Sequence, residues 1–123
     1  MSTESQAAPV VADLADLRFS PTAALFEGGK VAGIGITVFV VHQKPGGFVE
    51  LHTHPYPETF FVIAGRGRWT AGETVVELGP EQVVSVPAET LHGFRNLGDG
   101  ELHVLSVHES PTLIQTFTET PPA

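Results

Sequence analysis

The chain has 123 residues, about one domain, and its 14 acidic and six basic residues give it a net charge of −8. The basic residues are scattered, so no basic patch is present to neutralise nucleic-acid phosphates or an anionic membrane surface. The absence of cysteine excludes disulfides, thiolate metal sites and cysteine nucleophiles. We therefore expect neither nucleic acid nor a membrane as a partner.

The N-terminal end lacks the features of a signal peptide, because residues 1–13 contain no basic region followed by a long apolar stretch. The longest apolar run, residues 31–41, is too short to span a bilayer. We therefore expect a cytoplasmic protein. The small and polar residues 1–12 predict a disordered tail, and residues 13–119 predict a single domain.

Along the chain, the pattern becomes β after residues 13–19, which read as a short helical turn or an irregular lead-in. Runs rich in Val, Ile, Phe and Thr alternate with turn residues and predict ten strands, at 23–27, 31–43, 47–53, 58–64, 67–71, 74–78, 82–86, 91–97, 101–108 and 112–118. The connections are too short for crossover helices, so neighbouring strands should be mostly antiparallel. These features predict an all-β jelly-roll barrel.

The strand expected at 58–64 has apolar side chains on both faces. Because side chains alternate along a strand, Phe60 and Val62 share one face with Glu58, and Phe61 and Ile63 share the other. A strand of this kind needs a covering layer on each side. That layer is either the rest of the protein or a second copy of it, so we expect a homodimer.

Two histidines and a glutamate are the first candidates for chemistry. His52 and His54 are two residues apart, which places both imidazoles on one face of a strand. Glu58 follows after the turn made by residues 55–57 and opens the next strand, where its carboxylate can reach the same ion. Taken alone, each residue could instead be an ordinary structural or solvated side chain.

A third imidazole is available from His92, which opens the strand that carries Phe94. Three neutral imidazoles and one carboxylate suit a divalent transition metal ion: Fe, Mn, Ni, Co, Cu or Zn. Four protein ligands on an ion that prefers six leave two positions for water, dioxygen or a chelating substrate.

Two spaced motifs carry a resemblance to a known family. Residues 46–65 read G-x5-H-x-H-x3-E-x6-G, and residues 79–96 read G-x7-P-x-E-x2-H-x3-N. They resemble the two motifs of the cupin superfamily, and the chain is similar to its small single-domain members. The spacer between Gly79 and Pro87 is two residues longer than the common form, and Glu89 stands where a glycine is usual.

The resemblance implies a jelly-roll barrel that holds a metal ion through His52, His54, Glu58 and His92. If the position of Glu89 requires a positive φ angle, the glutamate there costs on the order of 1 kcal/mol relative to glycine.

Five further side chains are candidates for the wall of a substrate pocket: Phe60, Trp69, Phe94, Ser106 and His108. The aromatic residues have a simpler interpretation as core filling. Ser106 and His108 are either donors that support the metal ligands or hydrogen-bonding residues at the rim of the barrel.

These features predict a metal-dependent enzyme of the oxygenase or oxidoreductase type that acts on a small organic molecule, aromatic ones included. Glu58 is the candidate catalytic residue, because it could leave the ion and act as a base. One alternative is a Lewis-acid isomerase or polyketide-type cyclase, and another is a binding or sensing module without catalysis. Sugar phosphates are disfavoured, since no basic residue falls on the expected inner face.

Overall fold

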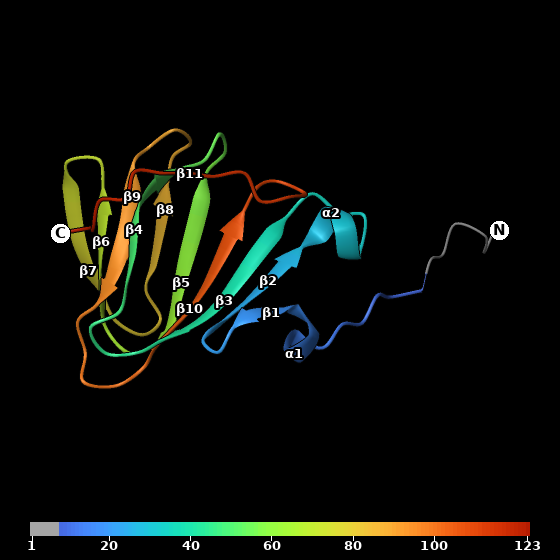
Figure 1. Ribbon diagram of the computed structural model, residues 1–123, viewed down its shortest axis with the longest axis horizontal. Coiled ribbons are helices and arrows are strands. Elements are labelled where there is room, and N and C mark those ends of the chain that lie inside the picture. The colour runs from blue at the N-terminus through green and yellow to red at the C-terminus, as the bar shows by residue number, and fades with distance from the viewer. Residues whose placement is uncertain (1–7) are drawn as a thin grey trace.

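The computed structural model describes residues 8–123 and contains two antiparallel sheets that face each other (Figure 1). The six-stranded sheet has the order β1 (Arg18–Ser20), β2 (Ala23–Glu27), β3 (Thr37–Gln43), β10 (Leu102–His108), β5 (Glu58–Ala64) and β8 (Val83–Val86). The five-stranded sheet has the order β11 (Thr116–Phe117), β4 (Phe48–Thr53), β9 (His92–Asn96), β6 (Gly67–Ala71) and β7 (Thr74–Leu78). The all-β, jelly-roll prediction is confirmed.

Strand β10 shows why these residues form a two-layer structure. It pairs with β3 along one edge and with β5 along the other, so it lies inside the six-stranded sheet. Its side chains alternate between buried and half-buried positions along the whole strand. Val104, Ser106 and His108 therefore face the interior, while Leu105 and Val107 face outward.

The hydrophobic core lies between the two sheets and is built on aromatic side chains. Trp69 on β6 is fully buried and stacks on Phe94 of β9, with ring centroids 5.2 Å apart. Phe60 on β5 meets the Trp69 ring edge-on at 5.7 Å and so joins the two sheets. Leu102 and Val104 of β10 complete this buried cluster.

Two of the ten predicted strands are shorter than expected by more than two residues, and one strand was missed. The strand predicted at 31–43 begins only at Thr37, because residue 31 ends the one-turn helix α2 (Gly28–Val31) and Gly33 adopts a φ of 68° before β3. The strand predicted at 112–118 is reduced to β11, since the backbone at Leu113 and Ile114 bonds to side chains instead of a strand. The lead-in at 13–19 forms the helix α1 (Leu14–Leu17) and the start of β1.

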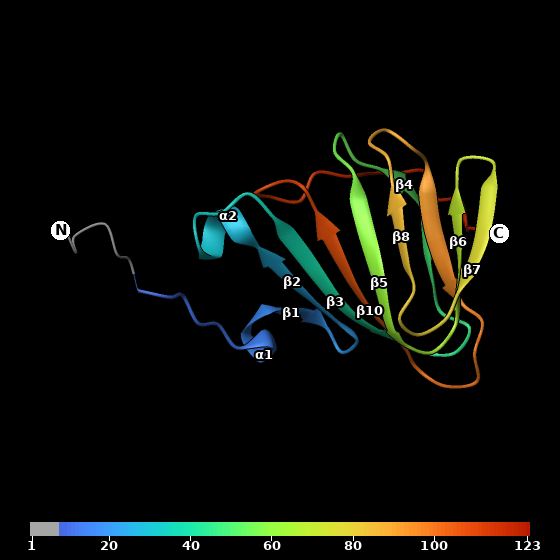
Figure 2. The same ribbon diagram turned by 180° about the vertical axis from the view of Figure 1, so that it is seen from behind.

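Residues 8–12 run away from both sheets in the two opposite views (Figures 1 and 2). Residues 8–12 are exposed and have no regular secondary structure. The rest of the predicted tail, residues 1–7, lies outside the described residues. Within residues 8–123 no helix is long and apolar enough to cross a membrane. The domain boundary at residue 13 and the cytoplasmic location stay predictions.

Glu89, which replaces the expected motif glycine, has a φ of 64°. This left-handed conformation is disfavoured for any residue with a Cβ atom. The turn keeps it because the Glu89 N–H donates a hydrogen bond to the His54 carbonyl at 2.8 Å.

We predict that Glu89→Gly raises the free energy of unfolding by up to about 1 kcal/mol, because glycine adopts this conformation without strain. Urea unfolding monitored by the fluorescence of the single tryptophan measures the change. Glu89→Ala is the matched control, since it removes the carboxylate but keeps the Cβ atom, and it should bring no such gain. An equal gain in both variants would contradict the explanation.

Candidate metal centre

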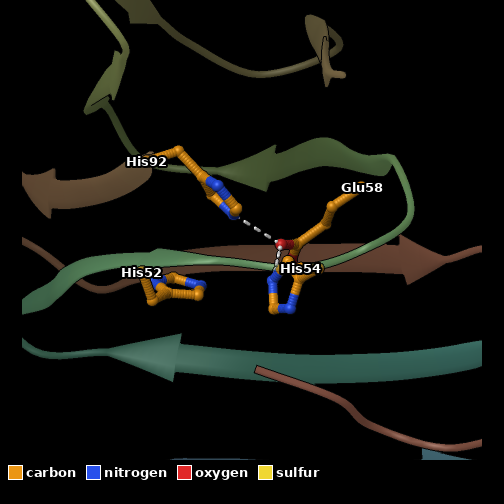
Figure 3. A group of neighbouring side chains, drawn as sticks. All are labelled: His52, His54, Glu58 and His92. Atoms are coloured by element: carbon orange, nitrogen blue, oxygen red, sulfur yellow. Dashed lines mark hydrogen bonds and ion pairs between the residues drawn. The ribbon is translucent and has the colours of Figure 1, made fainter. Parts of the chain in front are cut away.

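The four candidate ligands come from three strands and converge between the sheets (Figure 3). His52 lies on β4 directly opposite His92, the first residue of β9. His54 follows the end of β4, and Glu58 is the first residue of β5. All four are at most 5% exposed, and one ligand atom of each lies within 4.8 Å of those of the others. The structure thus brings together the set predicted from the sequence.

Each imidazole is oriented by a backbone carbonyl. The Nδ1 atom of His52 lies 2.7 Å from the oxygen of Glu50, and that of His92 lies 2.8 Å from the oxygen of Thr90. The Nδ1 atom of His54 lies 2.9 Å from the oxygen of Ile114. A carbonyl oxygen only accepts, so each Nδ1 carries the proton and donates it. The Nε2 atoms are consequently left with lone pairs directed into the cluster.

The arrangement around Glu58 requires a positive charge. Its Oε1 atom lies 2.9 Å from Nε2 of His54 and 2.8 Å from Nε2 of His92. In the tautomer set by the carbonyls, all three atoms are hydrogen-bond acceptors, so their approach is repulsive unless protons or a cation lie among them. A divalent transition metal ion satisfies all of these lone pairs at once, and imidazole nitrogen and carboxylate oxygen are ligands that suit it.

The electrostatics of the site favour its metal-binding protonation state. Burial lowers the pKa of His52 to about 4 and so keeps this imidazole neutral. Burial alone would raise the pKa of Glu58, but in the metal-free site the protons that His108, His54 and His92 direct at the carboxylate outweigh burial and hold the pKa well below its usual range. A neutral imidazole and an ionised carboxylate are the forms that bind a metal ion.

His108 supports the other oxygen of Glu58. Its Nε2 atom lies 2.9 Å from Oε2 of Glu58, although the two are poorly aligned for a hydrogen bond. Its Nδ1 atom lies 2.9 Å from the hydroxyl of Tyr56, which also accepts a hydrogen bond from the N–H of Ile114 at 3.1 Å. His108 is among the residues predicted from the sequence, whereas Tyr56 is not. The place of Tyr56 between two prolines, in the turn that joins His54 to Glu58, was the available signal.

A cavity of about 580 Å³ opens beside the cluster and reaches His52, Glu58 and His108. Three more of the predicted pocket residues line it: Phe60, Phe94 and Ser106. Trp69 is not among the described residues that line it, because it packs in the core against Phe60 and Phe94. The remaining wall is mainly apolar, and among the described residues only one lysine or arginine, Lys44, lines the cavity.

We predict that the metal-free protein loses stability as pH falls from about 6.5 to about 4. In this range His52 takes up a proton in the unfolded chain, where its pKa is near 6.5, but not in the folded protein, where it is about 4. Stability therefore rises with pH across this window. Thermal unfolding of chelator-treated protein at a series of pH values measures the slope.

The control for this effect is a pair of asparagine variants. His52→Asn should reduce the slope by up to one proton, which corresponds to about 1.4 kcal/mol per pH unit. Ser85→Asn should leave the slope unchanged, since Ser85 is exposed on the six-stranded sheet and has no ionisable side chain. Equal slopes in the wild type and in His52→Asn would contradict the assignment.

Two curated proteins that differ in activity are similar to this chain in sequence. The polyketide synthase CurC of Streptomyces cyaneus is 32% identical over 84 residues, which cover 64% of this chain and 54% of the relative. The dimethylsulfoniopropionate lyase DddQ of Ruegeria pomeroyi is 32% identical over 85 residues, which cover 68% of this chain and 42% of the relative. The chain thus matches about half the length of these relatives.

Solved structures with the same fold include the oxalate decarboxylase of Bacillus subtilis. One of its mutants superposes with a TM-score of 0.78 at 21% identity, over 96% of this chain and 35% of that chain. A structure from work on the Mn(II) centres of the same enzyme gives 0.73 at 22% identity, over 80% and 29% of the two chains. The family model of the cupin domain matches residues 39–108, which include all four candidate ligands. The chain belongs to the cupin family.

Proposed function

We propose that this protein is a metal-dependent enzyme that acts on a small apolar molecule of the aromatic or polyketide type. His52, His54, Glu58 and His92 hold the ion in this proposal. The observation that carries it is the placement of the cluster at a cavity of about 580 Å³ with a mainly apolar wall. A volume of this size accepts a molecule of several rings.

The charges of the cavity argue for this substrate class. A small dicarboxylate or a sugar phosphate needs cationic donors close to the ion. Lys44 is the only lysine or arginine among the described residues of the wall, and it follows Gln43 at the end of β3 remote from the cluster. A hydroxyketone needs no such donor, because its oxygens bind the ion directly. The similarity to CurC, a polyketide synthase by name, supports the same class.

The chemistry follows from the ion and from Glu58. A bound divalent ion acts as a Lewis acid that polarises a substrate carbonyl. Glu58 would leave the ion and take the proton from the carbon beside that carbonyl, and the apolar wall would keep competing water away. Phe60 and Phe94 contact the substrate rings, and His108 holds Oε2 of Glu58 in place. Isomerisation, cyclisation and elimination all begin with this proton transfer.

An oxygenase or other oxidoreductase is the second candidate. Four protein ligands leave two positions on a six-coordinate ion, which is enough for a chelating substrate or for a substrate oxygen and dioxygen together. The two candidates differ in their need for oxygen. A binding or sensing module without catalysis would use the same cavity and would give no turnover under either condition.

We predict that protein loaded with Mn(II) converts at least one member of a panel of β-diketones, flavonols and catechols. Products are followed by liquid chromatography and mass spectrometry, with and without dioxygen. Turnover that persists without dioxygen supports the Lewis-acid enzyme, whereas turnover that stops supports the oxygenase. The absence of turnover across the panel would contradict both.

The role of Glu58 is tested with the same assay. Glu58→Gln should lower kcat by at least about 100-fold even when excess metal restores binding, because the amide cannot take up the proton. Ser106→Ala is the matched control, since it changes another buried polar side chain of the wall and should have a smaller effect. Equal losses in the two variants would count against Glu58 as the base.

We also propose that the protein forms a homodimer through the outer face of its six-stranded sheet. One cross-strand row on this face consists of Val40, Leu105, Phe61 and Val83. Phe61 is 39% exposed and Val83 is 52% exposed. The row contains no charged side chain, so two copies can meet there without placing like charges in direct contact.

We predict that Phe61→Glu shifts the protein from dimer to monomer in sedimentation-velocity experiments, because it places a carboxylate at the centre of the row. Val75→Glu is the control, since Val75 is also exposed but belongs to the five-stranded sheet. A wild-type protein that sediments as a monomer at micromolar concentration would contradict this proposal.

A further inference from the structure

The cavity is long, and its two ends differ in chemistry. Glu58 and His108 pair at one end of the six-stranded sheet, and Gln43 pairs with Leu102 at the other end. Six residue steps along β10 separate these two positions, which corresponds to about 20 Å between backbone positions. A ligand spans only the part of this distance that the bound ion and the Gln43 side chain leave open. Both Glu58 and Gln43 line the cavity. A ligand bound at the cluster therefore points its remote part toward Gln43.

Apart from Ser106, the walls between the two ends are mainly apolar. They include Val41, Val49, Phe94 and Val104. A ligand that fills this section gains from burial of its rings but finds few polar side chains that could fix its orientation. Recognition of its remote part consequently depends on the polar groups at the far end.

Gln43 is held in an unusual way at that end. Its backbone is fixed, because the side chain of Asn96 donates a hydrogen bond to the Gln43 carbonyl at 2.9 Å. Its side chain is only 9% exposed, and within residues 8–123 its Oε1 atom has no hydrogen-bond partner. A buried amide oxygen without a partner is destabilising, and folded proteins rarely keep one without a reason.

The neighbouring backbone is shaped around this side chain. A Cβ atom on Gly47 would lie 2.8 Å from Cγ of Gln43, so a larger residue at position 47 would displace it. Gly47 also lines the cavity, and its carbonyl accepts a hydrogen bond from the N–H of Asn96 at 2.9 Å. The last torsion of a glutamine side chain is soft, so the amide can present either its oxygen or its NH₂ group to the cavity.

We propose that Gln43 is a specificity-determining residue that binds a hydroxyl group at the remote end of the ligand. This inference rests on the proposed function, since it takes the other end of the ligand to be held by the ion. A hydroxyl both donates and accepts, so it satisfies the amide in either orientation. The ligand is thus an elongated hydroxyaromatic molecule with a chelating hydroxyketone at one end and a hydroxyl at the other.

The test uses chrysin and apigenin, two flavones with the same chelating hydroxyketone. Apigenin carries one additional phenol hydroxyl at the far end of the molecule. Their affinities for the Zn(II)-loaded protein are measured by calorimetry, because zinc avoids redox turnover. We expect apigenin to bind wild-type protein roughly tenfold more tightly, which is the effect of one hydrogen bond to a buried amide.

Two variants test whether Gln43 causes the preference for apigenin over chrysin. Gln43→Leu keeps the shape of the side chain and should reduce the ratio of the two affinities to about one. Gln115→Leu removes the other glutamine of the wall and should leave the tenfold ratio intact. Equal ratios in wild type and Gln43→Leu would overturn the proposal, as would a wild-type protein that binds neither flavone.

A measurement without ligand tests the same idea independently. Because Oε1 of Gln43 is buried and unpaired, Gln43→Leu should leave Tm unchanged or raise it, and a clear fall would show that the amide serves the fold instead. His52→Ala separates this proposal from the proposed function. If the His52→Ala variant binds both flavones as tightly as wild-type protein does, the proposed metal-centred function is contradicted. If the preference for apigenin then disappears only in Gln43→Leu, the hydroxyl site at Gln43 is still supported.

Discussion

The convergence of imidazole lone pairs on the Glu58 carboxylate is the constraint on which the rest of this structure depends. Two Nε2 atoms lie within 2.9 Å of one carboxylate oxygen in a space that water does not reach freely. Their Nδ1 protons are already donated to backbone carbonyls. A folded chain can hold this arrangement only if positive charge neutralises it, and a bound divalent ion does so without reorganising the ligands.

The fold provides this geometry through strand register and through one irregular segment. The pairing of β4 with β9 sets His52 opposite His92, and the pairing of β10 with β5 sets His108 opposite Glu58. The segment before β11 completes the site, because the backbone of Ile114 accepts from His54 and donates to Tyr56. This segment cannot be a strand, since the groups that would form a ladder are used to orient the site.

The features set by regular strands could be predicted from the sequence, whereas those set by the irregular segment could not. The ligands His52, His54, Glu58 and His92 were predictable. All four belong to short motifs with fixed spacing, and the alternation of side chains along a strand places His52 and His54 on one face. Ile114 and Tyr56 were not predicted, since a contact between residues 58 positions apart leaves no local pattern. The strands were predictable where alternation is regular, as in β10. The strand start was misplaced at residues 31–36, because an apolar run concealed the turn that Gly33 and Gly35 indicate.

The polar groups in the interior also distinguish this jelly roll from one that is built for stability alone. A two-sheet fold of this length could fill its interior with apolar side chains, as Trp69 and Leu102 do in the core. Instead, the chain keeps a cavity with a charged cluster at one end and the amide of Gln43 at the other. Both features oppose stability in the free protein. A metal ion would supply the missing partner at the cluster, and in the proposal made above an elongated ligand would do the same for Gln43. The groups that weaken the empty fold would then select what it binds.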